Sequence, residues 1–221
     1  MTLNILYLAH DLTDAAIRRR VMMLTHGGAQ VTVAGFQRAD NRLADDPGVT
    51  TIVLGTTADG RFAQRIGAVA AAWLAMKRKL AGVQRPDVII GRNLEMLALA
   101  ARASGLFGGS IPVVYECLDI HRLLLDEGVK GRMLRMAEAG FGRRAQMLMT
   151  SSPAFIEHYF ARRSRLKIPT MLVENKVLDL TDVPAAAPDD ALEGRLLGRV
   201  EHVAGGEQED HRLVLRQLGI V

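Results

Sequence analysis

Short apolar runs alternate along this chain with stretches of helical periodicity, and this alternation constrains the fold more than any other feature. The runs consist mainly of aliphatic and β-branched residues, which favour buried strands. We predict strands at residues 3–9, 30–36, 49–54, 87–91, 111–115, 147–150 and 170–174. Strands that alternate with helices form parallel sheets. The sequence therefore predicts an α/β fold, an open parallel sheet with helices on both faces.

The helical patterns between these runs have recognisable ends and apolar faces. The first helix can be capped by Thr13 or Asp14, and Gly27-Gly28 would end it. A long helix over 62–80 follows the third run, and a proline after Ser152 would begin a later one. The apolar stripe of the long helix comprises Ile66, Val69, Trp73, Met76 and Leu80. From the strands, we expect the core to contain Ile5, Leu6, Val33, Ile89, Val113, Val114 and Leu148.

The composition predicts an ordered protein of a reducing compartment. Hydrophobic residues make up 49% of the 221, and Cys117 is the single cysteine, so an intrachain disulfide is impossible. The histidines lack the spacing of a metal site, and we predict none. The first residues lack a basic leader, and the apolar stretch 66–76 is too short to span a bilayer. We expect a cytoplasmic protein, soluble or peripheral on the inner face of the cytoplasmic membrane.

The net charge of +4 is unevenly distributed. Residues 181–221 hold eight acids and four arginines, which leaves 24 basic and 16 acidic residues in 1–180. A basic body of this kind favours phosphate-bearing ligands or an anionic membrane surface, and it can equally serve solubility. The helix over 129–144 and the turn 162–167 are the candidate membrane contacts. We expect no nucleic-acid binding, because the basic residues lack interleaved aromatics and a recognition helix.

Polar side chains follow four of the predicted strands where each strand ends. They are His10 and Asp11, Arg92 and Asn93, Glu116, Asp119 and His121, and Ser151 and Ser152. The carboxyl ends of parallel strands lie along one edge of a sheet, so these side chains can line one polar site. Local structural roles are the alternative. Asp11 would then be a turn residue, and Asn93, Asp119 and Ser152 would cap helices.

Several common enzyme classes are disfavoured by missing motifs. No glycine-rich dinucleotide fingerprint or phosphate-binding P-loop follows any predicted strand. A nucleophile elbow of the α/β-hydrolase type is also missing, and Ser151-Ser152 is followed by proline. The polar residues at the strand ends therefore need another explanation than these folds supply.

Three groups of segments resemble the N-terminal domain of GT-B glycosyltransferases, family-4-like, and in particular the succinoglycan-type exopolysaccharide enzymes. The likeness covers about residues 3–180. The segments are Ile5-Leu-Tyr-Leu-Ala-His-Asp-Leu-Thr-Asp14 and onward to Val21, with Gly28 to Phe36; Tyr115-Glu-Cys-Leu-Asp-Ile-His-Arg122; and Thr150-Ser-Ser-Pro-Ala-Phe155 with Val173-Glu-Asn-Lys-Val177.

The resemblance implies a Rossmann-like domain that recognises the acceptor, while a second domain binds most of the nucleotide sugar. It implies transfer from a nucleotide sugar to a lipid-linked or oligosaccharide acceptor, with the donor as substrate and no resident cofactor. It places His121 near the reacting sugar, with Asp119 as its catalytic neighbour and Glu116 beside them. The other strand-end residues would bind substrate, and Glu174, Asn175 and Lys176 would lie at the interdomain crossover.

Two departures from that family accompany the likeness. The first loop, from His10 to Thr13, lacks glycines that many relatives place near the donor phosphates. We further expect one domain over 1–180 and an acidic tail over 181–221, of short helices or disordered, that is no complete second domain. The chain would then be truncated or frame-altered and inactive by itself. Two alternatives are a non-catalytic Rossmann-like partner subunit and a single-domain enzyme for a small phosphorylated ligand.

Overall fold

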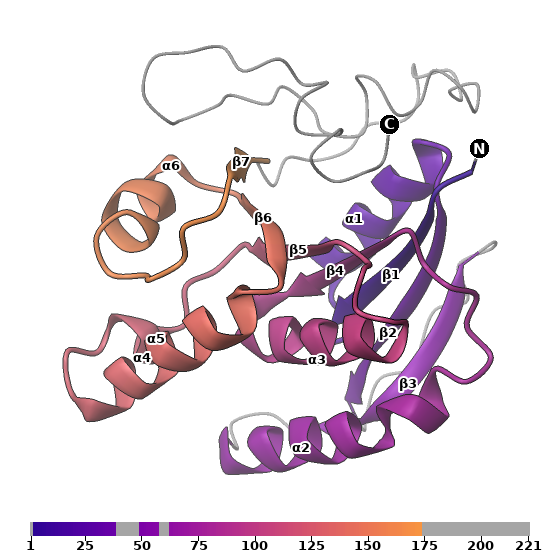
Figure 1. Cartoon of the computed structure of the whole chain (residues 1–221), viewed down its shortest axis with the longest axis horizontal. Coiled ribbons are helices and arrows are strands. Elements are labelled where there is room, and N and C mark those ends of the chain that lie inside the picture. The colour runs from indigo at the N-terminus through magenta and orange to yellow at the C-terminus, as the bar shows by residue number, and fades with distance from the viewer. Residues whose placement is uncertain (1, 39–48, 58–61, 174–221) are drawn as a thin grey trace.

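The computed structural model describes residues 2–38, 49–57 and 62–173, which form one seven-stranded parallel sheet flanked by helices (Figure 1). The strand order is β3-β2-β1-β4-β5-β6-β7, and every pairing is parallel. The predicted α/β architecture is confirmed. The strands are β1 (Asn4–Ala9), β2 (Gln30–Arg38), β3 (Thr50–Thr57), β4 (Val88–Arg92), β5 (Val113–Cys117), β6 (Ala145–Thr150) and β7 (Thr170–Leu172). The interdomain residues Glu174, Asn175 and Lys176 and the tail 181–221 lie outside the described residues.

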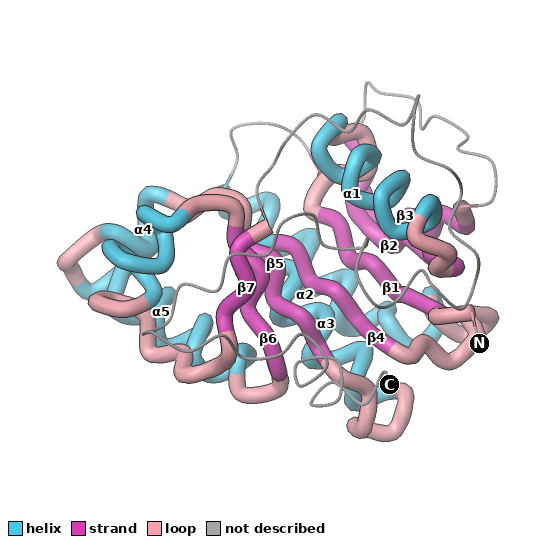
Figure 2. Tube along the Cα trace, turned by 90° about the horizontal axis from the view of Figure 1, so that it is seen from above, coloured by secondary structure: helices cyan, strands magenta, loops and turns pink. Residues whose placement is uncertain are grey.

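Helices cover both faces of the sheet, as expected. Side chains of α2, α3 and the end of η1 join one hydrophobic core with one face of the strands, and those of α1 join a second core with the opposite face. Figure 2 looks from above onto α1, with α2 and α3 behind the strands. The helices are α1 (Ala15–His26), α2 (Phe62–Lys79), α3 (Asn93–Leu106), α4 (Arg122–Leu125), α5 (Val129–Gly142), α6 (Pro153–Phe155) and the π-helix η1 (Ile156–Phe160).

The predicted core is confirmed, with one correction in the long helix. All seven core residues named from the strands are buried, and the most exposed of them, Val33, reaches 5%. In α2, Met76 and Leu80 are buried and Trp73 packs partly against the core. Ile66, by contrast, is 55% exposed. It lies in the second turn of α2, where the helix does not pack on the sheet but lines a surface cavity between α2, α3 and α5.

Strand β5 begins two residues later than predicted. The apolar run starts at Ile111, which is buried, but Pro112 has no N–H to donate to a neighbouring strand. Its carbonyl accepts from the amide of Ile89 at 3.0 Å. Regular pairing then runs from Val113 to Glu116 against β4. The strand also ends two residues later than predicted, at Cys117. Glu116 is consequently a strand residue and not a loop residue.

The later helices confirm one predicted cap and correct another. Ser152 is the N-cap with Pro153 at the first helical position, as predicted, and the helix that follows to Phe160 consists of the single turn α6 and the π-helix η1. Helix α4 was not predicted, and its N-cap is His121, so the interpretation of Asp119 as a helix cap is wrong. Among the described residues, no helix combines the length and apolar character needed to cross a bilayer.

Strand order changes direction at β1, and this places the candidate site. The chain runs outward from β1 to β2 and β3, then returns to the other side of β1 at β4. Loops that leave β1 and β4 at their carboxyl ends therefore diverge and leave room between them, where open α/β sheets bind ligands. His10 and Asp11 follow β1 there, and Arg92 and Asn93 end β4 and begin α3.

Candidate functional site

Asp14 brings the predicted residues of β1 and β4 together. Its Oδ2 lies 3.5 Å from Nε2 of His10 and 3.7 Å from Nη2 of Arg92. Its other oxygen accepts from the backbone N–H of Ala16 at 2.8 Å and caps α1. One carboxylate thus caps α1 and contacts an imidazole and a guanidinium at the place where the strand order changes direction. Asp14 was predicted only as a helix cap.

Asp11 lies beside this cluster but is used within the protein. Its Oδ1 accepts from the N–H and hydroxyl of Thr13 at 2.9 and 2.6 Å, which makes it a turn residue. Its Oδ2 lies 2.6 Å from Nε of Arg38 at the end of β2. Asp11 is only 5% exposed. The local alternative for Asp11 is therefore observed, and a direct contact with substrate stays a prediction.

Arg92 and His10 carry polar atoms that no described residue satisfies. Arg92 is 5% exposed, yet its Nε and Nη1 have no hydrogen-bond partner in the described part of the chain. Burial would lower the pKa of Arg92, but Tyr7, Glu116 and Asp14 outweigh it and raise that pKa. Burial and the charge of Arg92 lower the pKa of His10, whose Nδ1 is also unpartnered among these residues. A cationic donor and a neutral imidazole with spare hydrogen-bonding capacity suit a polar or anionic ligand.

Asn93 has a backbone conformation that side chains rarely adopt. Its φ is 68°, in the left-handed region, at the junction of β4 and α3. The N-cap of α3 is Arg92, so Asn93 begins the helix and does not cap it. Its Oδ1 is buried without a hydrogen-bond partner among the described residues. Strained residues with unused polar atoms are concentrated at binding sites.

Glu116 lies in the interior and faces α1. It is fully buried, and its Oε1 accepts from Nε of Arg20 at 2.7 Å. Its Oε2 accepts from the hydroxyl of Tyr7. Burial and the nearby Glu116 carboxylate raise the pKa of Tyr7 well above its usual value. Neither partner of Glu116 was predicted from the sequence. Arg20 lies three residues after Ile17 and four before Leu24, on the buried face of α1, which could have signalled a paired cation.

His121 lies on the opposite side of the sheet from Glu116. Its Nδ1 accepts from the N–H of Leu123 at 3.2 Å and caps α4, so a neutral ring carries its proton on Nε2. The exposed imidazole lines a cavity of about 500 Å³ between α2, α3 and α5. Asp119 is exposed in the preceding loop. The structure therefore separates Glu116 from the proposed catalytic pair.

Glu95 connects the two regions. It lies in the first turn of α3, forms an ion pair with Arg65 of α2 at 2.7 Å, and lines the same cavity as His121. Its charge also acts on the pKa of His10, opposing the effect of burial. The start of α3 thus lies between the cluster of Asp14, His10 and Arg92 and the cavity that His121 lines. Glu95 was not predicted as a site residue, since its position in a first helical turn already has a local explanation.

Ser151 and Ser152 border the same edge from β6. The hydroxyl of Ser151 donates to the carbonyl of Leu118 at 3.3 Å, which ties the end of β6 to the loop after β5. Ser152 is the N-cap of α6 by position, but its side chain makes no capping hydrogen bond in the described structure. Both residues are half-buried. Contact of either with a substrate stays a prediction.

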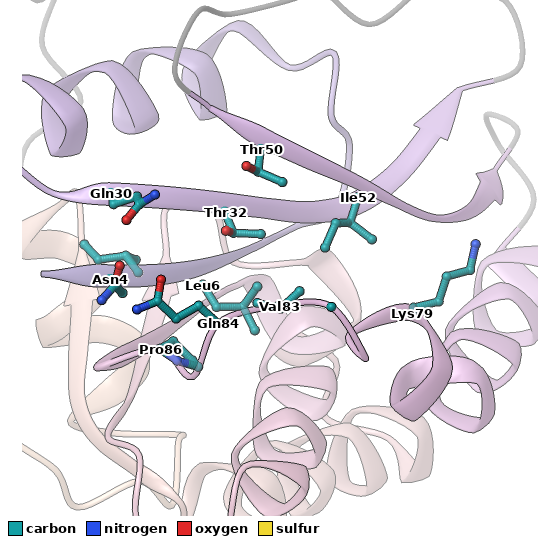
Figure 3. Close-up of a pocket in the computed structure, with 12 residues that line it drawn as sticks. Asn4, Leu6, Gln30, Thr32, Thr50, Ile52, Lys79, Val83, Gln84 and Pro86 are labelled. Atoms are coloured by element: carbon teal, nitrogen blue, oxygen red, sulfur yellow. The ribbon is translucent and has the colours of Figure 1, made fainter.

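A different cavity lies at the opposite edge of the sheet (Figure 3). It measures about 410 Å³ and is bordered by the first residues of three strands, Asn4, Gln30 and Thr50, together with the end of α2. Lys79 at its margin donates to the carbonyl of Val53 at 2.9 Å. Because this edge is formed by the amino ends of the strands, the cavity is remote from the polar residues at the carboxyl ends.

Comparison with known proteins assigns the family. The glycosyl transferase 4-like domain matches residues 14–175. The chain is 60% identical over 193 residues to the succinoglycan biosynthesis protein ExoL of Rhizobium meliloti (strain 1021), a match that covers 84% of this chain. It covers 48% of that protein, so the chain spans about half the length of this curated relative.

Solved structures support the same fold. Two structures of a sucrose-phosphate synthase from Thermosynechococcus elongatus superpose with TM-scores of 0.56 and 0.57 at 12% and 11% identity. They cover 77% and 78% of this chain, and 88% and 48% of the respective synthase chains. At such identities the likeness concerns the fold alone, which is that of GT-B glycosyltransferase domains. The domain match and this fold together show that the chain belongs to the glycosyl transferase 4-like family.

Proposed function

We propose that this chain is the acceptor-side domain of an exopolysaccharide glycosyltransferase, which transfers a sugar from a nucleotide sugar to a lipid-linked or oligosaccharide acceptor. The observation that carries the proposal is the 60% identity with a succinoglycan biosynthesis protein. Polar side chains at the carboxyl edge of the sheet support it. Arg92, Asn93 and His10 offer donors and acceptors that no described residue uses, which is what hydroxyl-rich and phosphate-bearing ligands require.

His121 is the proposed catalytic residue. Its Nδ1 accepts the hydrogen bond that caps α4, and the exposed imidazole can donate from Nε2 to a sugar hydroxyl or a phosphate oxygen. This fixed use of one ring nitrogen also sets the direction of the imidazole. Asp119, two residues earlier and exposed, is the proposed carboxylate partner for the acceptor.

The first loop supports a role in acceptor binding more than in donor binding. Helix α1 would be the natural site for donor phosphates, because helix N-termini bind anions. Here Asp14 already caps that terminus, and Asp11 lies three residues before it. Two carboxylates at this position repel a diphosphate unless Arg38 and Arg92 are redirected toward it. We therefore expect weak donor binding by this domain.

Acceptor binding is the test. Purified protein is incubated with lipid-linked oligosaccharides extracted from succinoglycan-producing cells, and the bound fraction is quantified. We expect saturable binding that falls about tenfold in His121→Asn, since loss of one charged or polar contact costs roughly 1.4 kcal/mol. Asparagine retains a capping acceptor for α4, so the helix is preserved. His158→Asn, at an exposed position on η1, is the matched control.

Nucleotide sugars are titrated in parallel by calorimetry, and transfer is followed with a radiolabelled donor and membrane extract. Undetectable donor binding with intact acceptor binding agrees with the proposal. Micromolar donor binding that is lost in His121→Asn would instead indicate a donor site. Binding of neither ligand by the folded protein would favour a non-catalytic partner subunit.

We also propose that the domain lies against an anionic membrane on the cytoplasmic side. Helix α5 exposes Val129, Met133 and Met136 at 70%, 60% and 51%, with Lys130 and Arg132 exposed between them. Arg163 of the basic turn donates to the carbonyl of Leu125 at 2.7 Å, so the turn 162–167 lies beside the start of this helix. Exposed apolar residues surrounded by cations are typical of interfacial binding.

Sedimentation with vesicles tests this contact. We expect binding to vesicles containing an anionic lipid at low salt and its loss at high salt. Met133→Ser combined with Met136→Ser should weaken binding, whereas Met22→Ser, at another exposed methionine on α1, should not. Equal binding to neutral and anionic vesicles would mean that the basic residues serve solubility.

A further inference from the structure

The cavity beside His121 is almost entirely apolar, although it opens at the surface. It measures about 500 Å³, within the range of small-molecule sites, and lies between α2, α3 and α5. Its walls are aliphatic and aromatic side chains from all three helices, including Val69, Leu94, Leu134 and Phe141. Its exposed residues include Ile66 at 55% and Leu74 at 81%. Large apolar side chains left exposed around a hollow mark a binding surface.

Polar groups are confined to one end of this cavity. Arg65, Glu95 and His121 lie there, because α2 and α3 both start at the carboxyl edge of the sheet. Further along α2, and near the end of α5, the lining is formed by Trp73 and Phe141, whose ring centroids are 6.0 Å apart. The cavity therefore has a polar end beside His121, at the proposed reaction site, and an apolar end beside Trp73 and Phe141.

The lining excludes most peptides as occupants. A peptide segment would bring N–H and C=O groups into a surface that offers hydrogen-bond partners only at its polar end, and each unpaired group is costly. A hydrocarbon chain carries no such groups. Its burial is favourable in proportion to the apolar area removed from water.

The surrounding charge indicates an anionic amphiphile. Lys130 and Arg132 are exposed in the first turn of α5, which starts at the carboxyl edge of the sheet, the same edge as the polar end of the cavity. The carboxylate at the cavity, Glu95, is already paired with Arg65. A phosphate attached to a lipid chain complements both the charge and the lining.

We infer that this cavity binds the hydrocarbon chain of a lipid-phosphate acceptor, with the phosphate and its glycan at the polar end beside His121. The inference rests on the proposed glycosyltransferase function and adds the place where the lipid binds. The cavity would hold the chain while the glycan reaches the carboxyl edge of the sheet. Acceptors that carry a chain then bind more tightly than the same glycan without one.

Fluorescence of Trp73 tests the inference directly. This residue is the only tryptophan of the chain and lines the cavity. The probe is dodecyl phosphate brominated on its chain, below its micellar concentration, with unbrominated dodecyl phosphate and inorganic phosphate as controls. Bromine quenches by contact, so we expect saturable quenching by the brominated probe, competition by the unbrominated one, and no effect of inorganic phosphate.

Two neighbouring alanines of α2 provide a matched pair of variants. Ala70 lines the cavity, and Ala71 is exposed on the same helix without lining it. Ala70→Phe fills the space and should raise the half-quenching concentration about tenfold or more, as expected when an apolar pocket loses room for its ligand. Ala71→Phe should behave as the unchanged protein. Quenching that rises linearly without saturation, or that is unchanged in Ala70→Phe, would overturn the inference.

The outcome is separable from that of the proposed function. Binding of lipid-linked glycan without quenching of Trp73 would leave the function standing and refute this chain-binding site. Quenching without any glycan binding would identify a lipid-binding cavity in a protein that is not the proposed enzyme. Sedimentation velocity excludes the remaining occupant. A dimer that dissociates in Ala70→Phe would show that a second copy covers the cavity, against the inference.

Discussion

Arg20 of α1 donates from Nε to Oε1 of Glu116 on β5 at 2.7 Å, across 96 residues of sequence. The side chains are 6% and 0% exposed. This buried ion pair fastens α1, whose N-cap is Asp14, to the central sheet. A buried charge is tolerated only when it is paired, so each partner depends on the other.

Removal of one partner should therefore cost more than removal of both. We expect Arg20→Met or Glu116→Leu to lower the free energy of unfolding by about 3–5 kcal/mol, and the double variant to recover much of that loss. Urea unfolding followed by circular dichroism measures it. The exposed pair Arg163–Glu127 is the control, with side chains 39% and 87% exposed, and its removal should cost at most about 1 kcal/mol. Strictly additive losses at Arg20 and Glu116 would argue against the coupling.

Glu138 predicts a pH dependence of stability with a definite sign. It is fully buried on α5 and accepts from the hydroxyls of Tyr115, Tyr159 and Ser164 at 3.1, 2.8 and 2.9 Å. Burial raises its pKa above the usual 4.5, and the hydrogen bonds from the three hydroxyls reduce that rise. The folded protein therefore binds this proton more tightly than the unfolded chain, and stability falls as the pH rises through the folded pKa.

The Glu138→Gln variant isolates this contribution. We expect the free energy of unfolding of the unchanged protein, relative to the variant, to be highest below pH 4.5 and to decrease above it. Taking the difference removes the contribution of the other carboxylates. A difference that increases with pH would mean that the hydroxyls stabilise the carboxylate more than burial disfavours it.

Gly91 should not tolerate a side chain. A Cβ at this position of β4 would lie 2.8 Å from the carbonyl oxygen of Met96 and 3.0 Å from Cβ of Ala100, both on α3. Gly91→Ala must push α3 from the sheet, and we expect a loss of about 1–3 kcal/mol. Gly67→Ala, in the open on α2, should be neutral or stabilising by roughly 0.5–1 kcal/mol. Thermal unfolding compares them, and equal effects would contradict the close contact.

Cys117 should be inert in the folded protein. It is 1% exposed, and burial raises the pKa of its thiol to about 12. Only the thiolate reacts quickly with disulfide reagents, and little of it forms at pH 8. We expect labelling by a chromogenic disulfide to be negligible in the native state and complete in denaturing urea. Rapid labelling without denaturant would show that the end of β5 opens.

Local sequence patterns were sufficient to predict the order and type of the main elements. Each strand is a short apolar run bounded by polar or glycine-containing segments, and burial on both faces of a parallel sheet requires that pattern. Residues such as Leu6 and Ile89 could be assigned to the core for this reason. The same logic placed His10 and Arg92 at one edge, because both end strands of the same direction.

The tertiary structure decided which residues distant in the sequence contact each other. Glu116 faces α1 because β5 continues to Cys117, two residues beyond its predicted end, so that Glu116 alternates with Tyr115 between the two faces of the sheet. Its pairing with Arg20 needs α1 on that face, and Asp14 meets Arg92 only because β4 pairs with β1. The sequence by itself determined the elements and their periodicity, since these depend on near neighbours. Partners 78 to 96 residues apart are selected by packing of the whole sheet, which no local pattern encodes.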